Sequence, residues 1–454
     1  MDYRLEKDSM GEIKVSNDKL WGAQTQRSYE NFPQGVARVP FDQIKSLVLV
    51  KKAAAIVNNK QGKLADSYKD AIVEACDRVL AGGFEDQFPL TVYQTGSGTQ
   101  TNMNVNEVIA HLANESLGEK LIHPNDHVNM SQSTNDSFPT AMHLTSLRMI
   151  SEDLLPEVDA LSNEFYKRAE DFEGIIKTGR THLQDATPLP LADEIKTYGD
   201  LIKRDGDYIR QSAKALEFLA IGGTAVGTGL NTKKGYDTEM AATLSDLSGL
   251  TLKADPNKFL QLSSKHGMAK AHGAIKILAS DLLKIAEDIR FLSSGPRTGI
   301  GELIIPSNEP GSSIMPGKVN PTQVEMLAMI CLEVMANDQA ISLANALGQL
   351  ELNAYMPFIL YKMVDSVKIL SKGLHSFNIH LVKGLCANGE KIAENLEKSL
   401  MLVTALSPHI GYDKASDLAK FAHKNKLSLR EANAKLGFVT DEEFIKIVDP
   451  KKMV

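Results

Sequence analysis

Residues 275–292, IKILASDLLKIAEDIRFL, carry the pattern that decides the fold. Apolar residues recur along this stretch in steps that alternate strictly between three and four, at Ile275, Leu278, Leu282, Ile285, Ile289 and Leu292. Such alternation draws one apolar seam along an α-helix, by which long helices pack at a shallow angle. The stretch therefore predicts a long helix in a helical bundle.

Further stretches share this character. The same spacing joins Val367, Leu370, Leu374, Phe377 and Leu381, and steps mostly of three and four join Met142, Leu147, Ile150, Leu154, Val158, Leu161 and Phe165. Pro156 lies inside the latter set and is expected to kink or end its helix. With the helix-like residues 189–217 and 321–350, we expect about five long helices between 133 and 389. Their seams are suited to packing against other copies of the chain; a monomeric bundle is the alternative.

Composition agrees with a helical protein of several domains. The chain has 454 residues, more than one hydrophobic core usually organises, and an aromatic content of 6%, which favours helix over strand. We expect an all-α fold of three helical domains. Residues 1–132 are predicted to be shorter helices broken by polar loops, 133–389 a central long-helix bundle, and 390–454 a small domain with turns at Gly411, Asp413 and Gly437.

Several functional classes are disfavoured by the sequence. The net charge is -7 and no Lys/Arg block is long, so nucleic acid is not an expected partner. No signal peptide and no apolar run near the roughly 18 residues of a membrane span is evident, which predicts a cytoplasmic protein without a membrane partner. The three cysteines form no close pair and are expected to be reduced. His266 and His272 lie six apart, on different sides of a helix, so no metal is expected.

Four polar islands interrupt the helical pattern. Each is rich in Gly, Ser, Thr, Asn or His and is predicted to be a loop or a helix start with free hydrogen-bond donors. They are Thr95–Asn106 (TGSGTQTNMNVN), His123–Asp136 (HPNDHVNMSQSTND), Gly179–Asp185 (GRTHLQD) and Gly311–Gln323 (GSSIMPGKVNPTQ). Donors of this kind, converging, bind an anion. The alternative for any one island is an ordinary helix cap.

Two islands supply candidates for acid–base chemistry. In the last island, Ser312 stands near the Lys318 ammonium and glycines that expose backbone amides, which favours a serine alkoxide. In the third, His182 lies in a polar context and can hold or deliver a proton near neutral pH. A solvated surface loop and a structural histidine are the respective alternatives. Glu325 would orient the His182 imidazole if the chain brings them together.

With these residues in view, the chain resembles the fumarase/aspartase superfamily, and within it the class II fumarases. The similarity runs from Glu6–Arg27 to His409–Ser416, and the decamer Gly311–Asn320, GSSIMPGKVN, matches the superfamily signature. The histidine in GRTHLQDATP resembles fumarases, whereas aspartases carry glutamine at that position. Gly317 likewise matches the fumarase form of the signature.

The resemblance implies a cofactor-free, metal-independent hydro-lyase of the tricarboxylic acid cycle. Class II fumarases add water reversibly across fumarate to give (S)-malate, by anti addition through an aci-carboxylate intermediate. The resemblance also implies a homotetramer with a twenty-helix core, each active site being assembled from three subunits. An aspartate ammonia-lyase is the nearest alternative, and a non-catalytic relative such as a lens crystallin is another.

Carried over position by position, the resemblance assigns roles to named residues. Ser312 matches the catalytic base, His182 its acid–base partner, Glu325 the partner of the histidine, and Lys318 a further catalytic residue. The dicarboxylate substrate is expected to contact Ser97, Gly98, Thr99, Ser133, Thr134, Asn135, Thr181, Ser313, Lys318, Val319 and Asn320. A second, non-catalytic dicarboxylate site is expected at His123, Pro124, Asn125 and Asp126.

Two positions depart from the family pattern. Fumarases usually read SSND where this chain has STND at residues 133–136, so Thr134 adds a methyl group and resembles aspartases. Lys120 stands where some relatives carry arginine, and lysine lacks the bidentate fork of a guanidinium. The first departure bears on substrate preference and the second on the strength of the second site.

Overall fold

The computed structural model describes residues 2–454, which form two compact units. Unit 1 comprises Met1–Pro156, Asp207–Ala279 and Leu332–Ser371, and unit 2 comprises Glu157–Gly206, Ser280–Cys331 and Lys372–Val454. Five helices contribute residues to both units: α6 (Leu155–Asp171), α7 (Leu191–Ala213), α10 (His266–Leu292), α11 (Thr322–Ala346) and α12 (Met356–His380). The division into three domains expected from the sequence remains a prediction.

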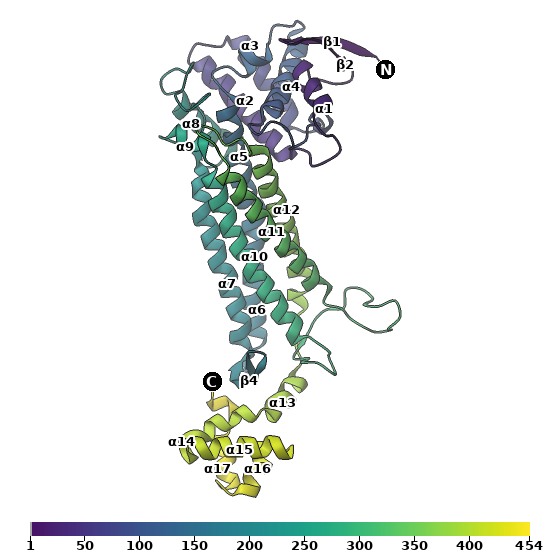
Figure 1. The fold of residues 1–454 in the computed structure, drawn as a ribbon, viewed down its shortest axis with the longest axis vertical. Coiled ribbons are helices and arrows are strands. Elements are labelled where there is room, and N and C mark those ends of the chain that lie inside the picture. Colours follow the sequence, from purple (N-terminus) through teal and green to yellow (C-terminus); the bar gives the residue numbers. More distant parts are fainter. Residues whose placement is uncertain (1) are drawn as a thin grey trace. The chain divides into compact units, whose positions relative to one another are not determined.

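Unit 1 contains most of the shorter helices. They are α1 (Ala23–Asn31), α2 (Phe41–Lys60), α3 (Asp66–Leu80), α4 (Thr99–Leu117), α5 (Thr134–Met149), α8 (Tyr236–Ser248), α9 (Lys258–Ser263), the π-helical turns η2 (Pro124–Val128) and η3 (Ile150–Leu154), and the 3-10 turns η1 (Glu85–Gln87) and η4 (Lys214–Glu217). Helix α2 packs against α3, α5 and α8, and α3 packs against α4 (Figure 1). A short parallel pair joins β5 (Phe218–Leu219) to β6 (Lys253–Ala254).

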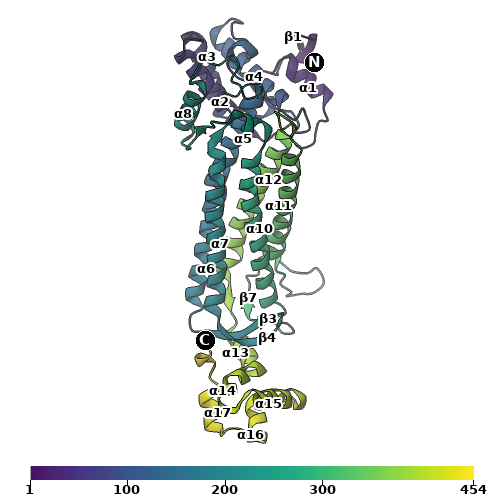
Figure 2. The same cartoon turned by 60° about the vertical axis from the view of Figure 1, so that its left-hand side comes forward.

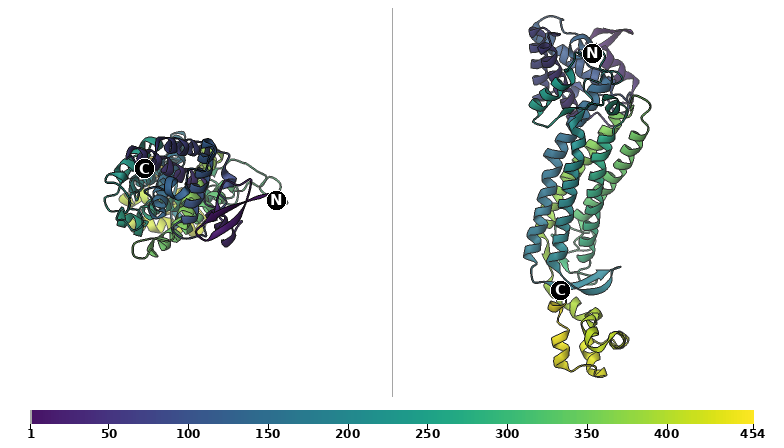
Figure 3. Two further views of the ribbon diagram at one scale, coloured as in Figure 1. Left: turned by 90° about the horizontal axis from the view of Figure 1, so that it is seen from above. Right: turned by 90° about the vertical axis from the view of Figure 1, so that its left-hand side faces the viewer.

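The first residues of unit 1 are not helical, contrary to the sequence prediction for residues 1–132. Strands β1 (Tyr3–Asp8) and β2 (Gly11–Ser16) form an antiparallel hairpin, which is the purple strand pair in both views of Figure 3. The turn is closed by the Met10 amide, which donates to the Asp8 carboxylate at 2.9 Å, and by Gly11 at a φ of 112°. The short polar turn between two alternating segments was the signal that the helical interpretation missed.

Unit 2 combines segments of long helices with small elements. The remaining helices are α13 (Gly389–Lys398), α14 (Ser407–Ile410), α15 (Tyr412–Asn425), α16 (Leu429–Leu436), α17 (Asp441–Ile447), and the 3-10 turns η5 (Val382–Gly384), η6 (Leu400–Leu406) and η7 (Pro450–Lys452). Strand β3 (Ile176–Thr181) pairs with β4 (Gln184–Pro190), and β7 (Leu303–Ile304) pairs with β8 (Cys386–Ala387) (Figure 2). The helical content confirms the predicted all-α class.

Side-chain hydrogen bonds tie the long helices of unit 2 together. Ser162 of α6 donates to the Gly199 carbonyl of α7 at 2.9 Å, and Tyr198 of α7 donates to Asp288 of α10 at 3.1 Å. Ser376 of α12 donates to Gln323 of α11 at 2.9 Å. Figure 2 shows these helices running side by side.

The predicted seams are buried. Their side chains are at most 7% exposed at all of the positions named from the sequence, and most are fully buried. The long helix expected across 142–165 is present but irregular, because a π-helical turn, Ile150–Leu154, lies between α5 and α6 and the backbone stays helical at Met149, Ile150 and Leu155. Pro156, at the second residue of α6, cannot donate a backbone hydrogen bond to the turn before it, which accounts for the π-helical turn.

Helix α11 differs from the other long helices in its exposed face. Its apolar window is only 33% buried within the chain, and among the helices of residues 2–454 it alone is long and apolar enough to cross a membrane. One such helix is weak support for a membrane span. An apolar face on a bundle helix is equally suited to packing against another protein chain.

Candidate active site

Two helix starts lie together in unit 1 and carry several of the predicted substrate-binding residues. Helix α4 begins at Thr99 and α5 begins at Thr134. The side-chain amide of Asn102 in the first turns of α4 donates to the Thr134 hydroxyl at 2.9 Å, which joins the two helix ends. The Ser97 and Thr99 hydroxyls lie 2.8 Å apart. Because the amino end of a helix carries a partial positive charge, this arrangement favours an anion, although the Thr101 amide already donates to Gln94 and the Asn135 amide to Ser133.

The start of α4 depends on Gly98. Its φ is 78°, and a Cβ atom at this position would lie 2.4 Å from the Phe138 ring of α5. Only glycine therefore allows Ser97 and Thr99 to sit this close to α5.

The start of α5 is fixed by a capping box. The Ser133 hydroxyl accepts from the Asn135 amide at 3.2 Å, and the Asp136 carboxylate accepts from the Ser133 amide at 2.9 Å. Asp136 is fully buried and also accepts from the amides of Gly222 and Thr224, at 3.0 and 2.9 Å. Burial raises its pKa to about 6, against the lowering effect of these donors. The Asp136 carboxylate thus holds the start of α5 in place through the Ser133 amide and joins it to the backbone of Gly222 and Thr224.

A buried lysine, which the sequence analysis did not single out, lies in the same region. The Lys51 ammonium of α2 is fully buried and donates to the side-chain oxygens of Asn129 and Gln132, at 2.9 and 3.0 Å. Burial lowers its pKa to about 7. The signal in the sequence was the pair Lys51–Lys52 within an apolar helix, where at least one lysine has to face inward.

His182 lies on the turn of a β-hairpin, whereas the rest of the Gly179–Asp185 island is strand and not the loop or helix start that we predicted. Thr181 pairs with Gln184 across the β3–β4 hairpin, which leaves His182 and Leu183 as its two-residue turn. Both have positive φ, 57° and 58°, a conformation unusual for a non-glycine residue and especially for leucine. Such backbone strain costs about 1–3 kcal/mol per residue and clusters at functional sites. His182 and Thr181 are exposed.

The predicted orienting contact to His182 is not formed within the chain. Glu325, at the start of α11, pairs instead with Arg290 of α10, at 3.7 Å between Nη2 and Oε1. Over residues 2–454, no hydrogen bond or ion pair joins His182 to Glu325 or to Ser312.

The signature residues form a loop between β7 and α11, visible in Figure 1 as a long excursion. The Ser312 hydroxyl accepts from the amides of Ile314 and Met315, at 3.2 and 3.0 Å. Hydrogen bonds donated to an oxygen favour its charged form, so these amides stabilise a serine alkoxide. The loop closes on itself, because the Gly311 amide donates to the Lys318 carbonyl at 2.9 Å.

The other predicted residues of this loop face solvent or brace it. Ser313, Lys318 and Val319 are exposed, and the Asn320 side chain donates to the Gly311 carbonyl at 2.6 Å. A Cβ atom at Gly311 would lie 2.2 Å from the Lys318 carbonyl oxygen, so glycine is required there. The same loop therefore carries an exposed lysine and a hydroxyl that accepts hydrogen bonds from two amides.

The four residues of the predicted second dicarboxylate site divide between two pockets of unit 1. Asn125 and Asp126 line a pocket of about 400 Å³ that also contains Ser133. His123 and Pro124 line a pocket of about 270 Å³ with Lys120. The His123 imidazole already accepts from the amides of Asn125 and Asp126, at 3.3 and 3.2 Å, as the cap of η2.

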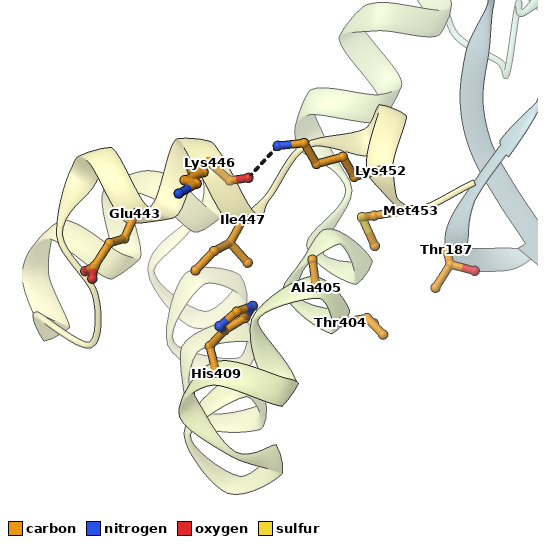
Figure 4. A pocket seen from close by; sticks show the side chains of 9 residues that line it. All are labelled: Thr187, Thr404, Ala405, His409, Glu443, Lys446, Ile447, Lys452 and Met453. Atoms are coloured by element: carbon orange, nitrogen blue, oxygen red, sulfur yellow. Dashed lines mark hydrogen bonds between the residues drawn. The ribbon is translucent and has the colours of Figure 1, made fainter.

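The largest of these pockets, about 630 Å³, lies in the carboxyl-terminal part of unit 2 and was not anticipated from the sequence. His409, Glu443, Lys446 and Lys452 lie around it (Figure 4). The Lys452 ammonium donates to the Lys446 carbonyl at 3.1 Å, and the Glu443 carboxylate accepts from the amide of Thr440, the N-cap of α17, at 2.9 Å. The pocket contains none of the residues predicted to act on substrate.

The cysteines form no disulfide and the possible metal ligands form no metal site among residues 2–454. Within residues 2–454, all three cysteines are unpaired, and no group of three or more His, Cys, Asp or Glu side chains is placed to hold a metal ion. Cys76 and Cys331 are buried, and burial raises the pKa of the Cys331 thiol to about 12. His272, one of the two histidines considered from the sequence, is buried between Asp338 and Ser366.

Comparison with known proteins places these features in a family. Residues 11–336 match the family described as Lyase, and residues 402–454 match Fumarase C C-terminus. The chain is 53% identical to the class II fumarate hydratase of Campylobacter jejuni and 51% identical to that of Helicobacter pylori, covering 100% of this chain and 99% of each relative. The crystal structure of class II fumarase from Schistosoma mansoni superposes with a TM-score of 0.97 at 41% identity, covering 100% of this chain and 99% of that one. The chain belongs to the class II fumarase family of lyases.

Proposed function

We propose that this chain catalyses the reversible hydration of fumarate to (S)-malate. The observation that carries the proposal is that the Ser312 hydroxyl accepts hydrogen bonds from two backbone amides, in a loop that also contains Lys318. The paired helix starts at Thr99 and Thr134 supply a second set of anion-binding groups.

The reaction is easiest to follow from malate. The Ser312 alkoxide takes the proton from carbon 3, and the electron pair of that C–H bond moves into the adjacent carboxylate, giving the dianionic aci-carboxylate. Lys318 and Asn320 stabilise this charge by hydrogen bonds placed in advance. The aci-carboxylate then collapses to the double bond as the carbon 2 hydroxyl leaves, protonated by His182 directly or through a water. The products are fumarate and water.

One hydrogen bond within the loop has to be replaced when substrate binds. The Asn320 amide that would reach the aci-carboxylate is bonded to the Gly311 carbonyl, so it exchanges that acceptor for substrate on binding. Gly311 and Gly317 flank the moving segment, and Gly317 has a φ of 80°. A loop closing over substrate also excludes water from the carbanion-like state.

The test is a fumarate–malate assay that follows fumarate absorbance with purified protein. Hydration without added ammonium, unchanged by a chelator, is the expected result. Consumption of fumarate that requires ammonium would identify an aspartate ammonia-lyase, which is the candidate that Thr134 favours. Loss of activity with chelator would refute the metal-independent mechanism.

We further propose that the enzyme assembles as a homotetramer whose sites combine residues of three subunits. The support is an exposed stripe on α11 at steps of three and four: Met329, Leu332, Ala336, Gln339 and Leu343. Leu332 and Leu343 are 58% and 56% exposed. A second apolar seam on a helix whose other face is already buried fits packing between chains.

The second dicarboxylate site, the cytoplasmic location and the place in the tricarboxylic acid cycle stay predictions. For the second site, Asn125, Ser133 and Lys63 in one pocket supply groups that an anion would bind, whereas the Asp126 carboxylate of the same pocket repels it and the capping role of His123 leaves its imidazole partly engaged.

A further inference from the structure

Strand β3 contains an irregularity directly before His182. Its pairing with β4 shifts register between Thr178 and Arg180, at Gly179. In a regular strand, residues three apart point to opposite faces of the sheet. The bulge changes this alternation, and Lys177 and Arg180 reach the same carboxylate, that of Glu302. A Cβ atom at Gly179 would lie 2.5 Å from the Thr187 carbonyl, so the bulge requires glycine.

Glu302 is a buried point of attachment for three segments of unit 2. Its carboxylate is fully buried and accepts both Arg180 guanidinium nitrogens, at 2.9 and 2.7 Å. The Lys177 ammonium lies 3.3 Å away, and Asn395 of α13 donates at 3.0 Å. Figure 2 shows β3, β4, β7 and α13 gathered in this part of unit 2.

The backbone of Glu302 is held as firmly as its side chain. Its amide donates to the Leu292 carbonyl at the end of α10, at 2.8 Å, and its carbonyl accepts from the Asn388 amide at 2.9 Å. Strand β7 follows at once, and the loop that carries Ser312 begins after it. Glu302 therefore lies at the root of that loop.

The charges around Glu302 balance within the cluster. Lys177, which is 1% exposed, also pairs with Glu194 at 3.0 Å, so two cations face two carboxylates. The Arg180 hydrogen bonds hold the pKa of Glu302 below its ordinary value despite burial. Removing one member of such a buried cluster leaves its partner uncompensated, so the cluster acts as one unit.

We infer that Glu302 is a positioning residue, which anchors the turn that carries His182 and the root of the loop that carries Ser312 to one buried carboxylate. The inference rests on the proposed hydration of fumarate. It gives the strained His182 turn a physical support, since Arg180 lies two residues before the turn. One substitution at Glu302 should disturb both candidate acid–base groups and leave the helix starts of unit 1 unaffected.

The test uses Glu302→Gln, which keeps the shape of the side chain and removes its charge. We expect kcat to fall at least tenfold per folded enzyme and KM to change less than threefold. Hydrogen exchange measured by mass spectrometry should rise in both segments 176–190 and 305–321. A loss of stability alone would lower the folded fraction without selecting these two segments.

Glu394→Gln is the matched control. Glu394 precedes Asn395 on α13 and, among residues 2–454, pairs with the half-buried Lys391 and the exposed Lys398 of the same helix. It should leave kcat and both exchange rates unchanged. If Glu302→Gln does not fold, Arg180→Lys, which keeps the charge and loses the fork, carries the test with an expected loss of at least threefold in kcat and faster exchange in 176–190.

The inference is overturned if the folded Glu302 variant retains kcat, or if exchange rises in neither segment. For the Arg180 variant, unchanged kcat together with unchanged hydrogen exchange in 176–190 would also overturn the inference. Failure of the proposed function is distinguishable, because it would show as absent hydration in the unsubstituted enzyme, whereas the exchange result does not depend on any activity.

Discussion

Replacing Gly98 by alanine offers a direct test of how the substrate-binding end of unit 1 is built. An alanine at a φ of 78° costs about 1–2 kcal/mol as left-handed backbone. Its methyl group would also lie 2.4 Å from the buried Phe138 ring, and such overpacking adds about 1–3 kcal/mol. Because the ring is enclosed, the first turn of α4 has to move instead. A displacement of about 1 Å at a site residue can cost roughly 100-fold in rate.

Gly118 provides the control from the other end of the same helix. It caps α4 at a φ of 73°, and no atom lies within 4 Å of the position that a Cβ would take. Gly118→Ala therefore carries the backbone cost alone. The melting temperature, measured by circular dichroism, should be lower for Gly98→Ala than for Gly118→Ala. We expect kcat/KM to fall at least tenfold only in Gly98→Ala. Equal melting and equal kcat/KM in the two variants would refute the crowding argument.

Three other substitutions test separate parts of the structure. Ser312→Ala should lower kcat by about 100-fold or more with unchanged melting, because the hydroxyl accepts only from amides of its own loop; near-normal turnover would remove Ser312 as the base. Since burial raises the pKa of Asp136 from 3.8 to about 6, the folded chain binds its proton more tightly than the unfolded chain, so this group makes stability decline as the pH rises from about 4 to about 6. The free energy of unfolding of the unsubstituted chain relative to Asp136→Asn should drop by up to ~3 kcal/mol over that range in urea titrations, and a difference independent of pH would contradict the assignment. Leu343→Lys should convert a species near four times the 49.6 kDa of one chain into smaller ones in sedimentation velocity, whereas an unchanged mass would place the interface elsewhere.

The bundle could be predicted because its signal is repeated and local. Every residue of the 275–292 seam is buried, as the spacing requires, and burial of apolar side chains dominates the free energy of folding. The π-helical turn before Pro156 follows from a missing backbone donor. Such features depend only on residues a few positions apart in the sequence.

The hairpin that carries His182 could not be predicted in the same way. The two-residue turn is formed by His182 and Leu183, not by the Asn-Gly or Gly-rich pairs that usually mark it. Its shape depends on Arg180 reaching Glu302, which lies 122 residues later in the chain. Lys51 escaped notice for a related reason, since only the fold reveals the two amide oxygens that accept from it. Long-range polar contacts leave no periodic trace.

Within unit 2, the contacts predicted among the candidate acid–base residues are not formed. Within residues 2–454, His182 stands exposed on its turn without a hydrogen bond, Glu325 is paired with Arg290, and Lys318 makes no ion pair. The His182 and Lys318 side chains are therefore available to contact substrate or another copy of the chain. If other copies of the chain do so through the apolar stripe of α11, activity depends on assembly. Specific activity should then fall as the enzyme is diluted below the concentration at which the tetramer dissociates, and should fall earlier for Leu343→Lys. A specific activity independent of concentration in fully dissociated enzyme would mean that one chain is sufficient.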